Sequence, residues 1–261
     1  MHLRIPSPNG LAAASLTTLA LLAASPALAA ERAFGPAETL TFECKYLGLP
    51  VGRVHTIVGA DTKIEGETVW PVMAVAKTDP VFVLYPIKDK YITWWNPEER
   101  LTLGNELSAE EKNERRRERI RFDRQKNKAM TRRDRPGQPR DERDFDIPPG
   151  SQDILAALFA IREKKLEVGD HEEMPIFTGR RVFTLKVDVE GKAKVETKAG
   201  RFDTKLLRVQ VEFSGQLATK RDLRIFVTDD PRHVPVRMDA EFLIGTLAAD
   251  LVSYQKGITA Y

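Results

Sequence analysis

Histidines are the side chains of this chain that most readily bind metals or move protons, so their spacing is examined first. Beyond residue 30 they occur at His55, His171 and His233. His171 precedes Glu172 and Glu173, and imidazole beside carboxylates is a donor set for a metal ion. The three histidines lie far apart in the sequence, and no His-x-x-x-His or paired His/Cys spacing occurs. We therefore expect surface histidines, no metal site and no cofactor.

Nucleophilic and acid–base chemistry has two further candidates, Cys44 and the adjacent carboxylates Asp229 and Asp230. Cys44 is the only cysteine, so it forms no disulfide within the chain, and no signature of a catalytic nucleophile surrounds it. It fits a small buried residue on a strand. Adjacent carboxylates can act as acid and base, but Pro231 directly after them favours a turn. No serine lies in a Gly-x-Ser-x-Gly motif, so the sequence predicts no catalytic residues.

Aromatic residues indicate a binding surface instead. Trp94 and Trp95 are consecutive on a predicted strand, so they point to opposite faces of the sheet. One of them belongs in the core, and the other can line a ligand groove together with Phe82, Leu84 and Tyr85. Plain core packing is the alternative for all of them. This group is the predicted wall of an apolar pocket.

One amphipathic helix is expected next to that pocket, over about residues 151–165. Pro148–Pro149 hold the chain extended before it, Ser151 is a suitable N-cap, and Asp153 places a negative charge in the first turn. Its apolar residues at helical spacing are Ile154, Leu155, Leu158 and Phe159. No second helix is predicted, so this stripe must pack on a sheet.

The last three residues of the stripe, Leu155, Leu158 and Phe159, are therefore candidate ligand contacts. If the stripe docks firmly on the sheet, Leu158→Ala should lower the free energy of unfolding by about 2–5 kcal/mol. If the helix is a mobile lid over a ligand cavity, the same change should weaken ligand retention instead.

Strands account for the remainder of the pattern. Residues 181–189, 208–213 and 234–242 alternate strictly between apolar and polar side chains, which is typical of strands with one buried and one solvated face. Turn residues follow these runs or separate them, at Glu190-Gly191, Ala199-Gly200 and Asp229-Asp230-Pro231.

The N-terminal half repeats this pattern. Residues 38–60 are typical of a hairpin that turns through Gly48-Leu49-Pro50, and strands are predicted over residues 68–78 and 90–96. No ten-residue helices separate these strands, which argues against a parallel α/β sheet. The predicted fold is mainly β: a curved antiparallel sheet, as a partly open barrel or a sandwich, with one central amphipathic helix packed on it.

Residues 107–145 form a charged insertion. Helix propensity favours a helix over residues 109–126, but Ile120 and Phe122 alternate with arginines, as in a strand with one solvated face. We favour two long exposed strands with a disordered tip. The charge is either a patch for an anionic partner or a solvated sheet edge that discourages aggregation.

The first 29 residues fit an export signal. An alanine-rich apolar run follows Arg4, and Ala27-Leu28-Ala29 matches the small-x-small rule, which predicts cleavage before Ala30. Residues 30–261 are then expected to form a single exported mainly-β domain without a transmembrane segment. In a cell with two membranes this domain would be periplasmic. The 41 basic and 38 acidic residues of the chain give no indication of nucleic-acid binding.

Five stretches carry a family resemblance, in order: YLGLPVG, LYPIKDK, FDIPPGSQDILAALFAIR, TKAGRFDT and VTDDPRHVPVRMDAEFLIGTLAADL. With them the chain resembles, over about residues 39–254, an exported bacterial family catalogued as domain of unknown function 3108. The resemblance implies an exported, mainly antiparallel β fold with a helix between its halves, and it brings no catalytic residues. The arginine-rich length of the charged insertion departs from the family pattern.

Two functions of different classes remain open. The first is a non-catalytic binding or carrier module for an apolar or lipid-like ligand of the cell envelope, such as an acyl chain. The second is a structural or interaction protein of the envelope, whose charged segment contacts another envelope protein. An enzyme on a cell-wall or lipid substrate is a third alternative, with no motif behind it. A continuous apolar cavity beneath residues 151–162 favours the carrier, and a solid core favours the interaction protein.

Overall fold

The computed structural model describes residues 32–79, 86–111, 114–213, 216–217, 223–241 and 245–259. The predicted export signal and three residues of the predicted pocket wall, Phe82, Leu84 and Tyr85, lie outside the described residues. Within the described ranges, no helix has the length and apolarity that crossing a bilayer requires.

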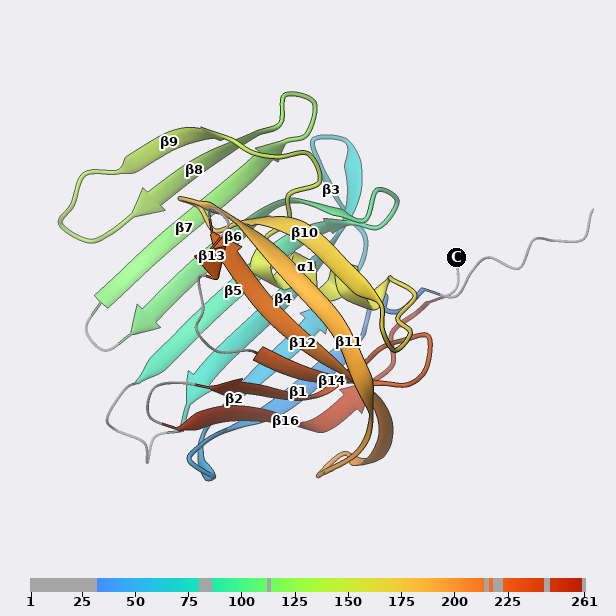
Figure 1. The fold of residues 1–261 in the computed structure, drawn as a ribbon. Coiled ribbons are helices and arrows are strands. Elements are labelled where there is room, and N and C mark those ends of the chain that lie inside the picture. The colour runs from blue at the N-terminus through green and yellow to red at the C-terminus, as the bar shows by residue number, and fades with distance from the viewer. Residues whose placement is uncertain are drawn as a thin grey trace, which may run out of the picture.

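One antiparallel sheet makes up most of the molecule and curls around the helix α1 (Ile154–Arg162), as Figure 1 shows. Its strands are β1 (Thr39–Tyr46), β2 (Leu49–Val58), β3 (Thr62–Ile64), β4 (Glu67–Thr78), β5 (Ile87–Asn96), β6 (Leu101–Glu111), β7 (Glu114–Asp123), β8 (Lys128–Asp134), β9 (Asp141–Asp146), β10 (His171–Phe177), β11 (Val182–Thr197), β12 (Gly200–Phe213), β13 (Gln216–Leu217), β14 (Leu223–Thr228), β15 (Pro235–Glu241) and β16 (Thr246–Gln255).

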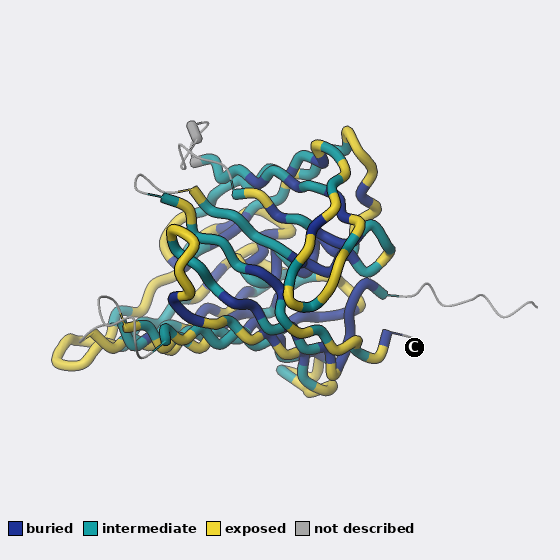
Figure 2. The backbone as a smooth tube through the Cα atoms, turned by 90° about the horizontal axis from the view of Figure 1, so that it is seen from below, coloured by how far each residue is buried: buried dark blue, intermediate teal, exposed yellow. Residues whose placement is uncertain are grey.

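The strand order is β10-β11-β12-β14-β15-β16-β1-β2-β4-β5-β6-β7-β8-β9, with β3 beside β4 and β13 beside β12. In the described part of the chain β9 and β10 are the two edges and do not pair with each other, so the sheet is not closed into a barrel. The predicted mainly antiparallel β fold around one helix is confirmed. Buried residues concentrate where the sheet surrounds the helix, whereas exposed residues dominate the β8–β9 arm at the left of Figure 2.

The long hairpin of β11 and β12 corrects one predicted turn. Glu190-Gly191 is not a connection, because β11 continues through it to Thr197 with a register shift between Val189 and Gly191. A β-bulge adds a residue to one strand, so the alternation changes face beyond it. Val187 and Val189 pack beside the helix, whereas Val195 joins a separate cluster with Leu40, Phe42 and Leu251.

The charged insertion is β structure, as predicted, and it contains more strands than predicted. Residues 107–145 contribute the end of β6, all of β7 and β8, and most of β9. Turns at residues 124–127 and 135–140 take the place of the predicted disordered tip. Its arginines pair mainly across strands, as Arg119 does with Glu106 at 2.9 Å and Arg133 with Glu118 at 2.8 Å. These cross-strand pairs explain why a sequence with high helix propensity forms a sheet.

The helix is shorter than predicted and begins later. Its N-cap is Asp153 and not Ser151, because Gln152 forms a parallel bridge with Ile176 of β10 and keeps the chain extended up to that point. The predicted apolar stripe is also corrected. Phe159 is buried, Leu155 and Leu158 are half-buried, and Ile154 is 61% exposed. Completely or nearly buried helix residues are Ala156, Ala157, Phe159, Ala160, Ile161 and Arg162.

Candidate functional site

The helix divides the interior of the curled sheet into two unlike halves. On one side Phe159 packs into an aromatic core with Phe34, Trp70 and Trp95. The Phe34 ring centroid lies 4.6 Å from that of Phe159, 5.8 Å from that of Trp70 and 5.6 Å from that of Trp95. Edge-on and tilted contacts at these distances are typical of well-packed aromatic clusters. This half is solid core.

The other half contains a cavity of about 620 Å³ between the helix and strands β10, β11, β12, β14 and β15. Its apolar wall consists of Ala74, Ile154, Leu155, Ala157, Leu158, Ile161, Ile176, Phe183, Leu185, Val187, Leu207, Val209, Val211, Leu223, Ile225, Val227 and Met238. Tyr91, Arg162 and Thr178 complete the lining. Binding pockets for small molecules measure about 300–1,000 Å³ and are lined mostly by apolar side chains, so both size and lining suit an apolar ligand.

The structure separates the residues of the predicted pocket. Leu155 and Leu158 line the cavity. Phe159 and Trp95 are 1% and 0% exposed and belong to the aromatic core on the far side of the helix. Trp94 is half-buried on the opposite face of β5, beside Pro71. The sequence had indicated the alternating residues of β11 and β12 as one buried face, but a period-two pattern does not distinguish a cavity wall from a core.

Tyr91 brings one hydroxyl to this apolar lining. Burial raises the pKa of its phenol, and the Asp153 carboxyl nearby raises it further. The hydroxyl therefore stays protonated and neutral over the physiological range. The side-chain hydrogen bond with Asp153 already uses the phenol proton, so the hydroxyl oxygen can accept one hydrogen bond from the polar end of an otherwise apolar ligand.

The N-terminus of the helix is fixed by Asp153, which is fully buried. One carboxylate oxygen accepts the backbone N–H of Ala156 at 2.9 Å, and the other accepts the hydroxyl of Thr93 at 2.5 Å. Burial raises the pKa of Asp153, and the hydrogen bonds offset that effect in part. The side chain acts as a cap that connects α1 to β5.

Gln152 and Arg124 complete this anchor. The Gln152 side chain donates to the carbonyl of Arg100 at 2.8 Å and accepts the N–H of Thr102 at 3.0 Å. Arg124 donates to the carbonyls of Thr102 and Ser151, and burial lowers the pKa of its guanidinium to about 10. The Gln-Asp pair at the helix start therefore has a structural role.

We expect Asp153→Asn to leave the helix anchored and Asp153→Ala to lower the free energy of unfolding by about 0.5–2 kcal/mol, the usual value of an N-cap. Because folding raises the pKa of Asp153 above 3.8, its carboxyl stabilises the fold most below pH 3.8, and that contribution is lost as the pH rises through the folded pKa. The asparagine variant should therefore be at least as stable as the parent at neutral pH, and its advantage should shrink in acid. Urea unfolding between about pH 8 and about pH 4 measures this difference. Equal destabilisation by asparagine and alanine would exclude the capping role.

The C-terminus of the helix is fixed by a buried ion pair. Arg162 donates to both carboxylate oxygens of Glu38, at 2.7 and 2.9 Å, and both side chains are 1% exposed. The same guanidinium donates to the carbonyls of Ala33 and Arg232, each at 3.1 Å, and lies 5.2 Å from the ring centroids of Phe34 and Phe159. Every polar atom of this side chain thus has a partner, and the helix is connected to the chain before β1.

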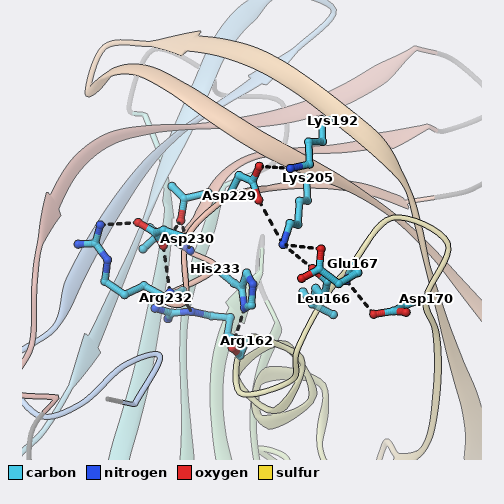
Figure 3. A network of polar contacts seen from close by, with 12 residues as sticks. Arg162, Leu166, Glu167, Asp170, Lys192, Lys205, Asp229, Asp230, Arg232 and His233 are labelled. Atoms are coloured by element: carbon cyan, nitrogen blue, oxygen red, sulfur yellow. Dashed lines mark hydrogen bonds and ion pairs between the residues drawn. The ribbon is translucent and has the colours of Figure 1, made fainter. Parts of the chain in front are cut away.

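A second polar network surrounds this helix end (Figure 3). Asp229 lies between Lys192 and Lys205, with N–O distances of 2.6 and 3.2 Å, and these lysines lower the pKa of its carboxyl. Lys205 is buried and also donates to the carbonyl of Leu166 just beyond the helix. Asp230 accepts from Thr228 and from the backbone of Arg232. The predicted turn role of the Asp229-Asp230 pair is confirmed.

The histidines lie apart from one another. His233 is buried, which corrects the predicted surface position; its ring bonds to the carbonyl of Arg162 at 3.0 Å, and burial lowers its pKa. His171 is exposed, and hydrogen bonds with Asp188 and Glu173 raise its pKa. His55 bonds with Thr41 at 3.0 Å. Among the described residues no group of His, Cys, Asp and Glu is arranged to hold a metal ion.

Cys44 is half-buried on β1 rather than fully buried as predicted. Burial raises the pKa of its thiol, so the reactive thiolate form is disfavoured. Its side chain is therefore poorly suited to nucleophilic chemistry.

Comparison with solved structures shows the same overall fold in a protein of another domain family. A β-barrel-like protein of domain of unknown function DUF1849 from Brucella abortus matches with a TM-score of 0.61 at 10% identity, over 88% of this chain and 100% of that chain. A candidate lipoprotein from Parabacteroides distasonis matches with a TM-score of 0.37 at 10% identity, over 86% and 99% of the two chains. A candidate exported protein with a YmcC-like fold from Bacteroides fragilis matches with a TM-score of 0.30 at 10% identity, over 87% and 99%.

At the level of sequence, no curated protein matches the chain significantly. The family model described as "Protein of unknown function (DUF3108)" matches residues 41–252, which include the helix with Asp153 and Arg162 and the cavity wall, whereas Glu38 lies just before the matched range. The chain therefore belongs to the DUF3108 family.

Proposed function

We propose that this protein is an exported, non-catalytic binding or carrier module that holds an apolar or lipid-like ligand beneath α1. The supporting observation is the cavity of about 620 Å³, whose lining is apolar except for Tyr91, Arg162 and Thr178. Arg162 already directs its guanidinium to Glu38, and the Thr178 hydroxyl contacts the carbonyl of Arg181 at 3.4 Å. The Tyr91 hydroxyl also has a partner, the Asp153 carboxyl, and its oxygen can still accept a hydrogen bond from the polar end of a ligand.

The rigidity of the helix favours a preformed cavity over a mobile lid. Both helix ends are fixed by buried polar contacts, at Asp153 and at Arg162. The face carrying Ala156, Phe159 and Ala160 packs against the aromatic core. A ligand therefore enters at the edge of the cavity, and the helix itself stays in place.

The proposed place of action is supported by the N-terminal sequence. The apolar run that ends in Ala27-Leu28-Ala29 supports export, which would put the cavity in the periplasm of a cell with two membranes. Acyl chains and other apolar envelope molecules are the ligands available there. An exported protein with an apolar cavity is suited to carrying such molecules through water.

Filling the cavity is the direct test. Leu158→Trp adds bulk on the cavity side of the helix, and we expect it to lower the affinity for a fluorescent fatty-acid probe at least roughly tenfold. The free energy of unfolding should change by less than about 3 kcal/mol, since existing space receives the larger ring. Lys165→Ala, on an exposed residue just after the helix, is the matched control and should leave probe affinity unchanged. If the parent binds no probe and retains no lipid in native mass spectrometry after purification from its own envelope, the proposed function is wrong.

A further inference from the structure

At one end of the curled sheet β1, β4, β6, β8, β12 and β15 end and β2, β5, β7, β9, β14 and β16 begin. The pairings place them together: Tyr46 lies opposite both Leu49 and Leu247, Thr78 opposite Gly52, and Ile87 opposite Glu111. In Figure 1 this end occupies the left and lower left of the molecule. We call it the rim and use only its described residues. Phe183, Val211 and Leu223 of the cavity wall are at or near the ends of their strands on this side, so the cavity extends toward the rim.

The β1–β2 turn exposes two leucines at the rim. Leu47 is 61% exposed and Leu49 is 67% exposed. Leu47 has φ = 51° and Gly48 has φ = 80°, so both residues of this two-residue turn are left-handed. Asn-Gly is the favoured pair in such turns, because leucine takes positive φ only at a conformational cost. The chain thus places a bulky apolar side chain on the outside of a tight turn, where neither folding nor solubility requires one.

A cationic groove of about 720 Å³ lies on the outer face of the sheet at the same end. Seven basic and three acidic side chains line it. Lys88 and Arg115 share Glu110, and Arg116 pairs with Glu111. The other four basic side chains are exposed and have no ion pair among the described residues: Lys77, Lys90, Arg117 and Arg135.

The four cations and the leucine turn lie at the same end of the sheet, with Lys77 on the strand next to β2 and the others on strands further along or just beyond β8. Lys77 lies opposite Arg53 on β2, the strand that begins with Leu49. Lys90 and Arg117 both lie opposite Ser108, one on each side of it. One end of the sheet therefore presents apolar side chains together with cations that have no ion pair in the part of the chain that the structure describes.

We propose that the rim docks on an anionic lipid surface, with Leu47 and Leu49 among the acyl chains and the four cations on the phosphate layer. Exposed apolar side chains beside basic residues match the two layers of such an interface, and a basic cluster is attracted by its negative potential. An acidic protein partner would use the cations and leave the leucines in water. The inference rests on the proposed function and adds a lipid surface as the partner. Docking would bring the cavity to the membrane that supplies or receives the apolar ligand.

Flotation with vesicles tests the inference. The full exported chain should float with phosphatidylcholine–phosphatidylglycerol vesicles, bind vesicles of phosphatidylcholine alone less, and dissociate as salt is added. Leu47→Asn/Leu49→Asn should reduce the bound fraction roughly tenfold, while the Asn-Gly turn it creates keeps the hairpin folded. Lys90→Glu/Arg117→Glu should remove the preference for anionic vesicles.

Matched controls lie at the opposite end of the sheet. Ile258→Asn alters an apolar side chain that is 60% exposed, and Lys63→Glu alters an exposed lysine of β3 that has no ion pair among the described residues. Both should float like the parent. The inference is overturned if the parent does not bind anionic vesicles. It is also overturned if the leucine double variant binds them as well as the parent, because the surface is then purely electrostatic. Binding of the fatty-acid probe separates the docking inference from the proposed function. A parent protein that binds the probe but does not bind vesicles supports the proposed function and contradicts the docking.

Discussion

Replacing Arg162 with methionine should lower the free energy of unfolding by about 3–5 kcal/mol, the usual result of breaking a buried ion pair by removing one partner. The change leaves the Glu38 carboxylate, in a side chain only 1% exposed, without its cation, and the carbonyls of Ala33 and Arg232 without their donor. It also removes the contact of the guanidinium with the Phe34 ring. Urea unfolding followed by tryptophan fluorescence measures the effect, because Trp70 and Trp95 belong to the adjacent core.

A double variant separates the cost of leaving one charge unpaired from the net contribution of the ion pair to the free energy of unfolding. Glu38→Leu/Arg162→Met replaces both charges by apolar side chains and should recover much of the lost stability, since the burial of two ions is itself costly. Lys194→Met is the surface control. Lys194 and Asp203 form an ion pair whose side chains are 88% and 74% exposed, and its loss should change the stability by less than about 1 kcal/mol. If Arg162→Met and Lys194→Met have the same small effect, the ion pair does not anchor the helix.

Truncation of two neighbouring helix residues should lower the free energy of unfolding by different amounts. Phe159→Ala removes a ring that is 1% exposed from the centre of the aromatic core, and we expect a loss of about 3–5 kcal/mol. Leu158→Ala removes a half-buried side chain that faces the cavity, and its cost should fall below about 2 kcal/mol, the lower end of the range for buried leucines. The half-buried position of Leu158 therefore lowers the expected cost below the range of about 2–5 kcal/mol that applies to a firmly docked stripe.

Ligand binding should show the reverse order for the two variants. Leu158→Ala changes the cavity wall directly and should weaken the retention of a fatty-acid probe. Phe159→Ala, measured at a temperature where it is fully folded, should bind the probe like the parent, because its ring lies across the helix from the cavity. Equal stability losses in the two variants would show that the helix does not separate a core from a cavity.

Local patterns of the sequence predicted the strands well. In β15 the polar Arg237, Asp239 and Glu241 alternate with apolar residues, and this pattern depends only on the direction in which successive side chains leave a strand. The turn at Asp229-Asp230-Pro231 was equally predictable, since proline and aspartate favour turns through their own backbones and side chains. The family match over residues 41–252 agrees with the resemblance carried by the quoted motifs.

Element boundaries depended on contacts between distant residues. Ser151 and Asp153 are both good N-caps, and the bridge from Gln152 to β10 determined which of them begins the helix. The alternation on both sides of Glu190 allowed a turn or a bulge, and pairing with β12 over the full length of the hairpin determined the bulge. Local propensity is similar for both outcomes in each case, so the partner strand decides.

The candidate site itself came from the tertiary structure. The sequence determined that one helix with an apolar stripe lies between strands, and it assigned that stripe to a single buried face. Only the packing decided that Phe34, Trp70 and Trp95 fill one side of the helix while β11, β12 and β14 leave a cavity on the other. Glu38 and Arg162, which fix that position, are 124 residues apart. A pattern of apolar residues indicates which side chains are removed from water. Whether these side chains pack against others or line a cavity depends on the distance to the facing strands.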